Sequence, residues 1–173
     1  MIAIERPIPD QERRSVPDGF DASTGLPNEP FWRLVLSAES SRGVRYGRVA
    51  TVVLVSVVGL DRVAREIGPD VVELTLARVA KLLRSGSRGS DYVARVGEAR
   101  FGVLLTETPE IAAINMVERV RDRCERELSR LAPGVHVAFG WASPPGTSTL
   151  VRAAVTAEAR LRREAARVID ESW

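Results

Sequence analysis

The stretch from residue 91 to residue 105 constrains the fold of this chain more than any other. Two apolar segments, Asp-Tyr-Val-Ala-Arg-Val and Phe-Gly-Val-Leu-Leu, flank four residues with turn character, Gly97, Glu98, Ala99 and Arg100. Apolar runs joined by a short turn that contains glycine predict an antiparallel β-hairpin. We therefore expect these two strands to lie side by side in a sheet.

Two further strands are predicted elsewhere in the chain. Residues 49–58 form a continuous run rich in valine, which is typical of a strand buried on both faces. Residues 135–142 follow Pro133 and Gly134 and have a similar apolar character. The sequence therefore provides at least four strands.

The segments between the strands have helical patterns. A helix after Asn28 is expected to bury Phe31, Leu34, Val35 and Ala38. Shorter and longer helices are predicted at 59–68, 71–83, 109–131 and after Pro144-Pro145-Gly146. The apolar positions expected inside the two middle long helices are Val71, Leu74, Leu76, Val79, Leu82 and Leu83, and then Ile111, Ile114, Val117, Val120 and Cys124. This order of elements predicts an α/β (α+β) fold with a single mixed central β-sheet flanked by helices.

Composition bounds the class of protein. The 173 residues fit one domain, and a net charge of +2 is too small for a polycationic nucleic-acid binder. No apolar run reaches the roughly 18 residues of a membrane span, and no signal peptide is visible. The single cysteine fits a reducing compartment. We therefore expect a cytoplasmic protein that binds neither nucleic acid nor membranes.

The chain divides into three parts by composition. Residues 1–20 contain three prolines and are interpreted as a flexible N-terminal arm. Residues 21–168 are expected to form the domain, and residues 169–173 a C-terminal tail.

Four segments, in this order, resemble the GGDEF (diguanylate cyclase) domain family. Residues 21–28, Asp-Ala-Ser-Thr-Gly-Leu-Pro-Asn, are similar to the family opening Asp-x-Leu-Thr-Gly-Leu-x-Asn. Residues 52–60 resemble its central strand and turn. Residues 95–105 resemble the hairpin whose turn normally reads Gly-Gly-Asp/Glu-Glu-Phe, and residues 135–142 resemble the strand that usually ends Ser-x-Gly-x-Ala. The resemblance implies the nucleotide-cyclase-like fold with its signature β-hairpin.

The resemblance also implies an activity whose residues are largely replaced here. Family members join two GTP molecules into cyclic di-GMP with divalent cations, which prefer carboxylate oxygens. The family's first metal aspartate falls on Ser56 and the second strand aspartate on Val58. The metal carboxylate of the hairpin falls on Ala99, the glutamate after it on Arg100, and the second glycine on Glu98. The degenerate active-site positions implied by the resemblance are Ser56, Val58, Ala64, Glu73, Gly97, Glu98, Ala99, Arg100 and Phe101. We therefore expect a catalytically inactive domain without a metal site or a cofactor.

A second site of the family has its residues retained. The resemblance implies an inhibitory-type Arg-x-x-Asp site that binds cyclic di-GMP, here Arg88 and Asp91, completed by Arg119. Arginine presents a planar fork to guanine or phosphate, and aspartate accepts from guanine N–H groups. The same pattern also occurs at 119–122 and 167–170, so Arg88 and Asp91 are alternatively an exposed ion pair.

Three functions remain open at this point. The first is a cyclic di-GMP receptor that signals through ligand-dependent protein interaction, with a homodimer or another protein as partner. The second is a nucleotide-independent protein-interaction scaffold that uses the N-terminal arm and the C-terminal helix. The third is GTP binding without turnover through Glu73.

Several other residues have structural interpretations. A turn and capping role is expected for Asp21, Thr24 and Asn28, and packing for Trp32 and Trp141. Cys124 is expected to be inert, and His136 to line a strand without a metal. A solvated face of the last helix is expected for Arg160, Arg162, Arg163 and Arg167.

Overall fold

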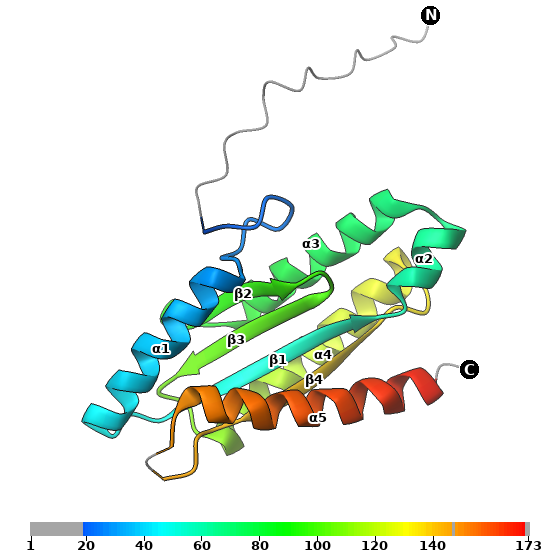
Figure 1. The fold of residues 1–173 in the computed structure, drawn as a ribbon. Coiled ribbons are helices and arrows are strands. Elements are labelled where there is room, and N and C mark those ends of the chain that lie inside the picture. The colour runs from blue at the N-terminus through cyan, green and yellow to red at the C-terminus, as the bar shows by residue number, and fades with distance from the viewer. Residues whose placement is uncertain (1–18, 147, 172–173) are drawn as a thin grey trace, which may run out of the picture.

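A computed structural model describes residues 19–146 and 148–171. The helices are α1 (Glu29–Tyr46), α2 (Leu60–Glu66), α3 (Pro69–Gly86), α4 (Glu110–Leu131) and α5 (Leu150–Glu171). The strands are β1 (Ala50–Val58), β2 (Tyr92–Gly97), β3 (Arg100–Thr106) and β4 (His136–Ala142). The order of helices and strands along the chain is the one predicted from the sequence (Figure 1).

The strands form one sheet in the order β2-β3-β1-β4. A single sheet flanked by helices and containing the 91–105 hairpin was predicted, and this is confirmed. The predicted mixed sheet would contain both parallel and antiparallel strand pairs. All three pairings among the described strands are antiparallel. The helical crossovers do join strands that run the same way, β1 to β2 and β3 to β4. Another strand lies between the members of each pair, so they share no hydrogen bonds.

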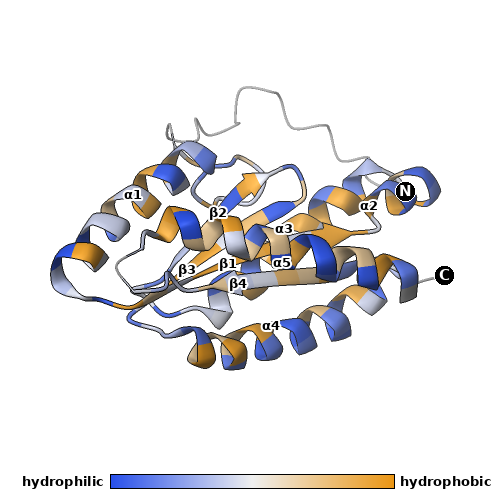
Figure 2. Cartoon of the chain, turned by 60° about the horizontal axis from the view of Figure 1, so that its bottom comes forward, coloured by the Kyte–Doolittle hydropathy of each residue, from blue (hydrophilic) through white to orange (hydrophobic). Residues whose placement is uncertain are grey.

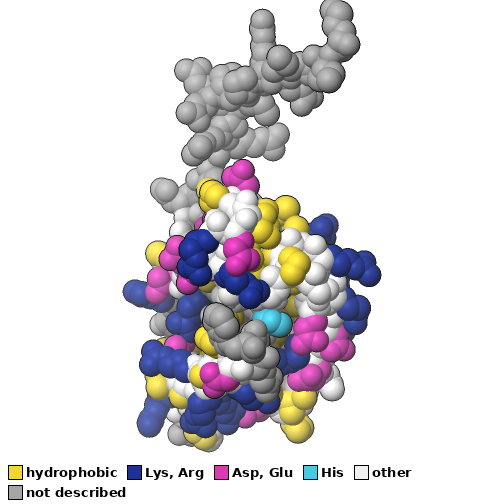
Figure 3. Space-filling view, turned by 90° about the vertical axis from the view of Figure 1, so that its right-hand side faces the viewer, with side chains coloured by type: hydrophobic (Ala, Val, Ile, Leu, Met, Phe, Trp, Pro, Cys, Tyr) yellow, Lys and Arg dark blue, Asp and Glu magenta, His cyan; other side chains and the backbone are white. Residues whose placement is uncertain are grey.

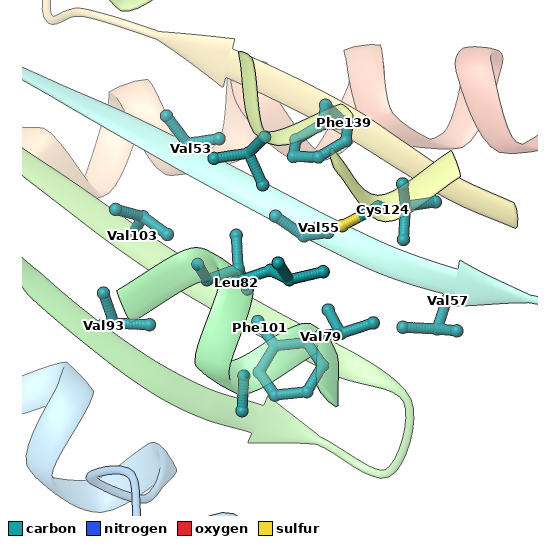
Figure 4. Packing of buried hydrophobic residues seen from close by; sticks show 14 of the residues in the cluster. Val53, Val55, Val57, Val79, Leu82, Val93, Phe101, Val103, Cys124 and Phe139 are labelled. Atoms are coloured by element: carbon teal, nitrogen blue, oxygen red, sulfur yellow. The ribbon is translucent and has the colours of Figure 1, made fainter. Parts of the chain in front are cut away.

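The helices cover the two faces of the sheet in separate groups. Helices α1 and α5 lie on one face, and α3 and α4 lie on the other (Figure 1). Alternate residues of β1 therefore enter different cores, as period-two side-chain directions require. Val53 and Val55 pack with Leu82, Phe101 and Cys124 under α3 and α4, as Figure 4 shows. The second core lies under α1 and α5 and contains Trp32, Leu36, Val52, Leu54, Leu104, Leu150, Ala153, Ala157 and Leu161.

The inner face of α1 is not the predicted one. Leu34 is 70% exposed, and the buried residues of α1 are Trp32, Leu36 and Ser40. The predicted packing role of Trp32 is confirmed, since its indole lies over Gly102 of β3. A Cβ at Gly102 would lie only 2.8 Å from the indole. Gly102 leaves space for the Trp32 ring, so the face of α1 that carries Trp32 packs on the sheet instead of the predicted face.

Two more apolar residues lie outside the core against expectation. Leu74 of α3 is 53% exposed and Ile111 of α4 is 74% exposed, while the predicted Val79, Val117 and Cys124 are buried. Thr75 is buried instead of Leu74, and its hydroxyl finds a partner inside the helix by donating to Val71 O at 2.6 Å. Hydrophilic residues recur along α4, and hydrophobic ones gather in the strands it covers (Figure 2).

The predicted N-terminal arm and C-terminal tail are described by the structure to different extents. Residues 1–18 of the predicted arm lie outside the described residues. Helix α5 continues to Glu171, so residues 169–171 of the predicted tail are helical. Within the described ranges, no helix has the length and apolarity needed to span a membrane.

Candidate functional site

The hairpin turn lies beside the end of β1. Glu98 and Ala99 form the two-residue loop between β2 and β3, and Val57 N–H donates to Ala99 O at 2.9 Å. The antiparallel ladder places Ser56 of β1 opposite Arg100 of β3. The fold therefore brings together residues from the two motifs to which the resemblance assigns the metal.

The groups at these positions are a hydroxyl, a methyl and a guanidinium. The Arg100 side chain forms an ion pair with Glu158 of α5, whose carboxylate also accepts from Arg162 Nε at 2.9 Å. Burial raises the pKa of Glu158, but the hydrogen bonds from Arg100 and Arg162 outweigh it and lower the pKa overall. Glu158 is therefore already engaged by two guanidinium groups. Across residues 19–146 and 148–171, no cluster of three or more His, Cys, Asp or Glu side chains is placed to hold a metal ion.

The positions expected to contact the nucleotide base lie on α2 and α3. Ala64 of α2 is exposed and offers no polar group. Glu73 of α3 is 55% exposed at its side chain, and its Oε2 lies 3.9 Å from Nη1 of Arg95. The carboxylate of Glu73 therefore faces a positive charge of the protein.

Arg95 joins the N-terminal loop to the hairpin turn. Its side chain is 11% exposed, and Nη1 lies 3.1 Å from Oδ1 and 3.3 Å from Oδ2 of Asp21. The same guanidinium donates to Gly97 O at 3.4 Å and to Glu98 O at 2.6 Å. Arg95 thus fixes the main chain of the turn to the carboxylate of a residue 74 positions earlier.

Asp21 makes both the predicted turn contacts and an ion pair with Arg95 that was not predicted. Its predicted turn contacts are present, since Oδ1 accepts from Thr24 N at 2.9 Å and Thr24 Oγ1 at 2.6 Å. Asn28 is the N-cap of α1, as predicted, and accepts from Phe31 N. Burial raises the pKa of Asp21, but hydrogen bonds from Thr24 and Arg95 lower it overall. The ion pair with Arg95 was missed, although both residues belong to segments that resemble the family.

Asp91 of the Arg-x-x-Asp segment is buried. It is 5% exposed, and its Oδ2 accepts from Arg88 N at 2.7 Å while Oδ1 accepts from Thr106 N at 3.1 Å. The Asp91 main-chain oxygen accepts from Arg84 Nη1 at 3.2 Å. This carboxylate therefore closes the loop between α3 and β2 and ties it to the end of β3.

Arg88 and Arg119 lie at the surface around this loop. Both side chains are exposed, and Arg119 Nη2 donates to Gly86 O at 2.9 Å across from α4 to the end of α3. Arg119 therefore contacts a residue that lies two positions before Arg88 in the chain. A groove of about 790 Å³ borders the same loop at Gly89 and Asp91, with Phe20, Phe31 and Tyr92 among its lining residues.

The remaining candidate residues have structural settings. Cys124 is fully buried, and burial raises the pKa of its thiol to about 12, which suppresses the reactive thiolate. His136 is half-buried at the start of β4, and Trp141 packs partly buried against the core under α3 and α4. The arginines of α5 include Arg160, which bonds to Trp141 O and Glu110. Basic and acidic side chains are interspersed over the face shown in Figure 3.

Comparisons with known proteins agree with this architecture. A family model described as the diguanylate cyclase GGDEF domain matches residues 19–166. The chain belongs to the GGDEF domain family. Diguanylate cyclase DosC of Escherichia coli K12 is 28% identical to it over 121 residues, which are 70% of this chain and 26% of DosC. The chain thus spans about a quarter of the length of that relative.

Solved GGDEF structures have the same fold. The coiled coil and GGDEF domain of DgcB from Caulobacter crescentus, in complex with c-di-GMP, has a TM-score of 0.77 at 16% identity, and the match covers 88% of this chain and 83% of the solved chain. Diguanylate cyclase SiaD from Pseudomonas aeruginosa, in complex with its activator SiaC, also has a TM-score of 0.77, at 27% identity. That match covers 91% of this chain and 60% of SiaD.

Proposed function

We propose that this GGDEF domain has no diguanylate cyclase activity and acts as a receptor for cyclic di-GMP. The ligand is held at the loop between α3 and β2, with Arg88 and Arg119 as the contacting cations. Binding changes how the domain associates with a second copy or with a protein partner. The observation that carries the proposal is the placement of these two exposed guanidinium groups around a loop fixed by buried Asp91.

The proposed inactivity rests on the chemistry of the donor set beside the hairpin turn. Magnesium on a triphosphate needs anionic oxygens, and phosphoryl transfer depends on that neutralisation. Ser56 offers a neutral hydroxyl, Ala99 offers no side-chain donor, and Arg100 adds a positive charge next to both. The residues present do not fit a divalent cation. Incubation with GTP and magnesium or manganese, followed by chromatography, tests this; cyclic di-GMP formed above a heat-killed control would contradict it.

Within the proposed receptor site, Asp91 is a positioning residue. Both of its carboxylate oxygens accept main-chain N–H groups and the residue is buried, so this carboxylate holds the loop rather than facing a ligand at the surface. Arg88 and Arg119 have exposed side chains that can reach a ligand from the surface. By analogy with base readout, each well-made arginine–guanine pair contributes about 1–3 kcal/mol.

Calorimetry with cyclic di-GMP, GTP and cyclic di-AMP in parallel tests the receptor proposal. We expect heat with cyclic di-GMP alone, and a loss of about 5- to 150-fold in affinity for Arg88→Ala and for Arg119→Ala, from the same energy range. Arg130→Ala is the matched control, because Arg130 is exposed on the same helix as Arg119 and lies about 16 Å along it. No heat with cyclic di-GMP, or equal losses for Arg130→Ala, would overturn the proposal.

A nucleotide-independent scaffold is the second candidate. Single large apolar side chains stand exposed on different helices, among them Leu34 at 70%, Ile111 at 74% and Val155 at 69%. Capture of the same defined partner with and without cyclic di-GMP would favour this function. The GTP-binding alternative depends on Glu73, and a thermal stabilisation by GTP that Glu73→Ala abolishes would favour it.

A further inference from the structure

Strand β4 lies at an edge of the sheet. It pairs with β1 on one side, and among the residues that the structure describes it is the last strand in the order β2-β3-β1-β4. An edge strand presents main-chain N–H and C=O groups to which another chain can pair. These outward groups belong to alternate residues, so Phe139 and Trp141 of β4 form one row with Ser143, which directly follows the strand.

Three charged side chains cover that row one after another. Glu164 Oε2 accepts from Phe139 N at 3.1 Å, Arg160 Nη1 donates to Trp141 O at 2.5 Å, and Glu110 Oε2 accepts from Ser143 N at 2.9 Å. Glu164 and Arg160 come from α5, and Glu110 comes from α4. We name Glu110, Arg160 and Glu164 the edge row.

The edge row is held in place by its own ion pairs. Arg160 bonds to the second oxygen of Glu110 at 2.5 Å, and the second oxygen of Glu164 bonds to Arg121. The Arg121 guanidinium also lies 5.0 Å from the centre of the Phe139 ring. Burial raises the pKa of Glu110, but the Ser143 N–H and Arg160 lower it overall, so this carboxylate stays ionised.

The surface next to the edge row favours association once the row is removed. Ile111, which is 74% exposed, lines with Ile114 and Trp141 a groove of about 520 Å³ between α4 and α5. Without the edge row, β4 would be exposed beside this apolar groove. Such a strand would be self-complementary, because an antiparallel pair of identical strands has twofold symmetry. A second copy of the chain is therefore the partner that fits.

We propose that the edge row is a blocking device that prevents β4 from pairing with β4 of a second copy. It joins three charged side chains from two helices to one main-chain group each of three alternate residues along this edge, Phe139, Trp141 and Ser143. The contact between copies that this device prevents is separate from any association controlled by cyclic di-GMP.

The test compares two double variants by light scattering over a concentration series. Glu110→Ala/Arg160→Ala uncovers Trp141 O and Ser143 N while leaving the more buried Glu164–Arg121 pair intact. Arg78→Ala/Glu127→Ala is the matched control: it removes an ion pair with side chains 44% and 38% exposed, against 43% and 38% for Arg160 and Glu110. The single variant Arg160→Ala provides a milder opening if the double variant folds poorly by circular dichroism.

We expect the edge-row variant to dimerise at least tenfold more tightly than the control and the unmodified chain. Amide hydrogen exchange at residues 139–143 should slow as the dimer forms. Equal association of the two double variants would overturn the proposal. Dimerisation without added protection on β4, or pairing of β4 in the unmodified chain, would overturn it as well.

Discussion

Replacing Asp91 by alanine is expected to destabilise the domain by about 3 kcal/mol. The carboxylate is 5% exposed and accepts main-chain N–H groups of Arg88 and Thr106 at 2.7 and 3.1 Å. A hydrogen bond to a charged group contributes about 1.5–3 kcal/mol, so the two bonds give roughly 3–6 kcal/mol. Arg88 lies in an exposed loop, where its N–H can bond to water after the substitution, and this places the loss near the lower end.

Urea unfolding followed by far-UV circular dichroism measures this loss. For a chain of this size, about 3 kcal/mol corresponds to a midpoint lowered by about 6–12 °C in a thermal scan. Asp91→Asn keeps one acceptor oxygen and should lose about half as much. Asp122→Ala is the control, because Asp122 ends a second Arg-x-x-Asp pattern but is exposed, and a change within about 0.5 kcal/mol is expected. Unfolding of Asp91→Ala at the urea concentration of the unmodified chain would refute the reasoning.

Three further predictions concern packing, capping and pH. Gly140→Ala should destabilise by about 3 kcal/mol or more, since its Cβ would lie 2.1 Å from Ala157 O; normal urea unfolding would contradict this. Ser40→Ala should cost about 1–3 kcal/mol in the same assay, because the buried Leu150 N–H loses its acceptor at 2.9 Å. The pKa of Asp21 is lower in the folded chain than its ordinary 3.8, so its stabilisation is present above that pH and is lost as the pH falls through the folded value. Asp21→Asn should therefore flatten the fall in unfolding free energy below about pH 4, and an unchanged slope would count against the ion pair.

The elements of this fold follow from local sequence patterns. The apolar runs around Gly97 and Arg100 became the β2–β3 hairpin, and the run at 49–58 became β1 within one residue of its predicted start. Such patterns are local because strand and helix periods are set by neighbouring residues. The four segments that resemble the GGDEF family identified the fold, which the family match and the solved structures then supported.

The inner faces of helices were predicted less well. Periodicity alone favoured Leu34 for the core, whereas the gap at Gly102 and the cap that Ser40 gives to α5 selected the opposite side of α1. Ile111 fits the apolar pattern of α4, yet its side chain is exposed and lines the groove beside β4. Which residues of a helix are buried depends on contacts with residues tens of positions away in the chain. A local periodicity carries no information about those contacts.

The sequence alone determined the order of strands and helices and the resemblance to the GGDEF family, because both depend only on residues that are near one another in the chain. Tertiary structure decided what the charged groups do. It turned Asp91 inward onto main-chain N–H groups, paired Arg95 with Asp21, and laid Glu164 against the edge of β4. The physical reason is that a charge takes its role from its partners in space, and these partners come from distant segments joined only by folding.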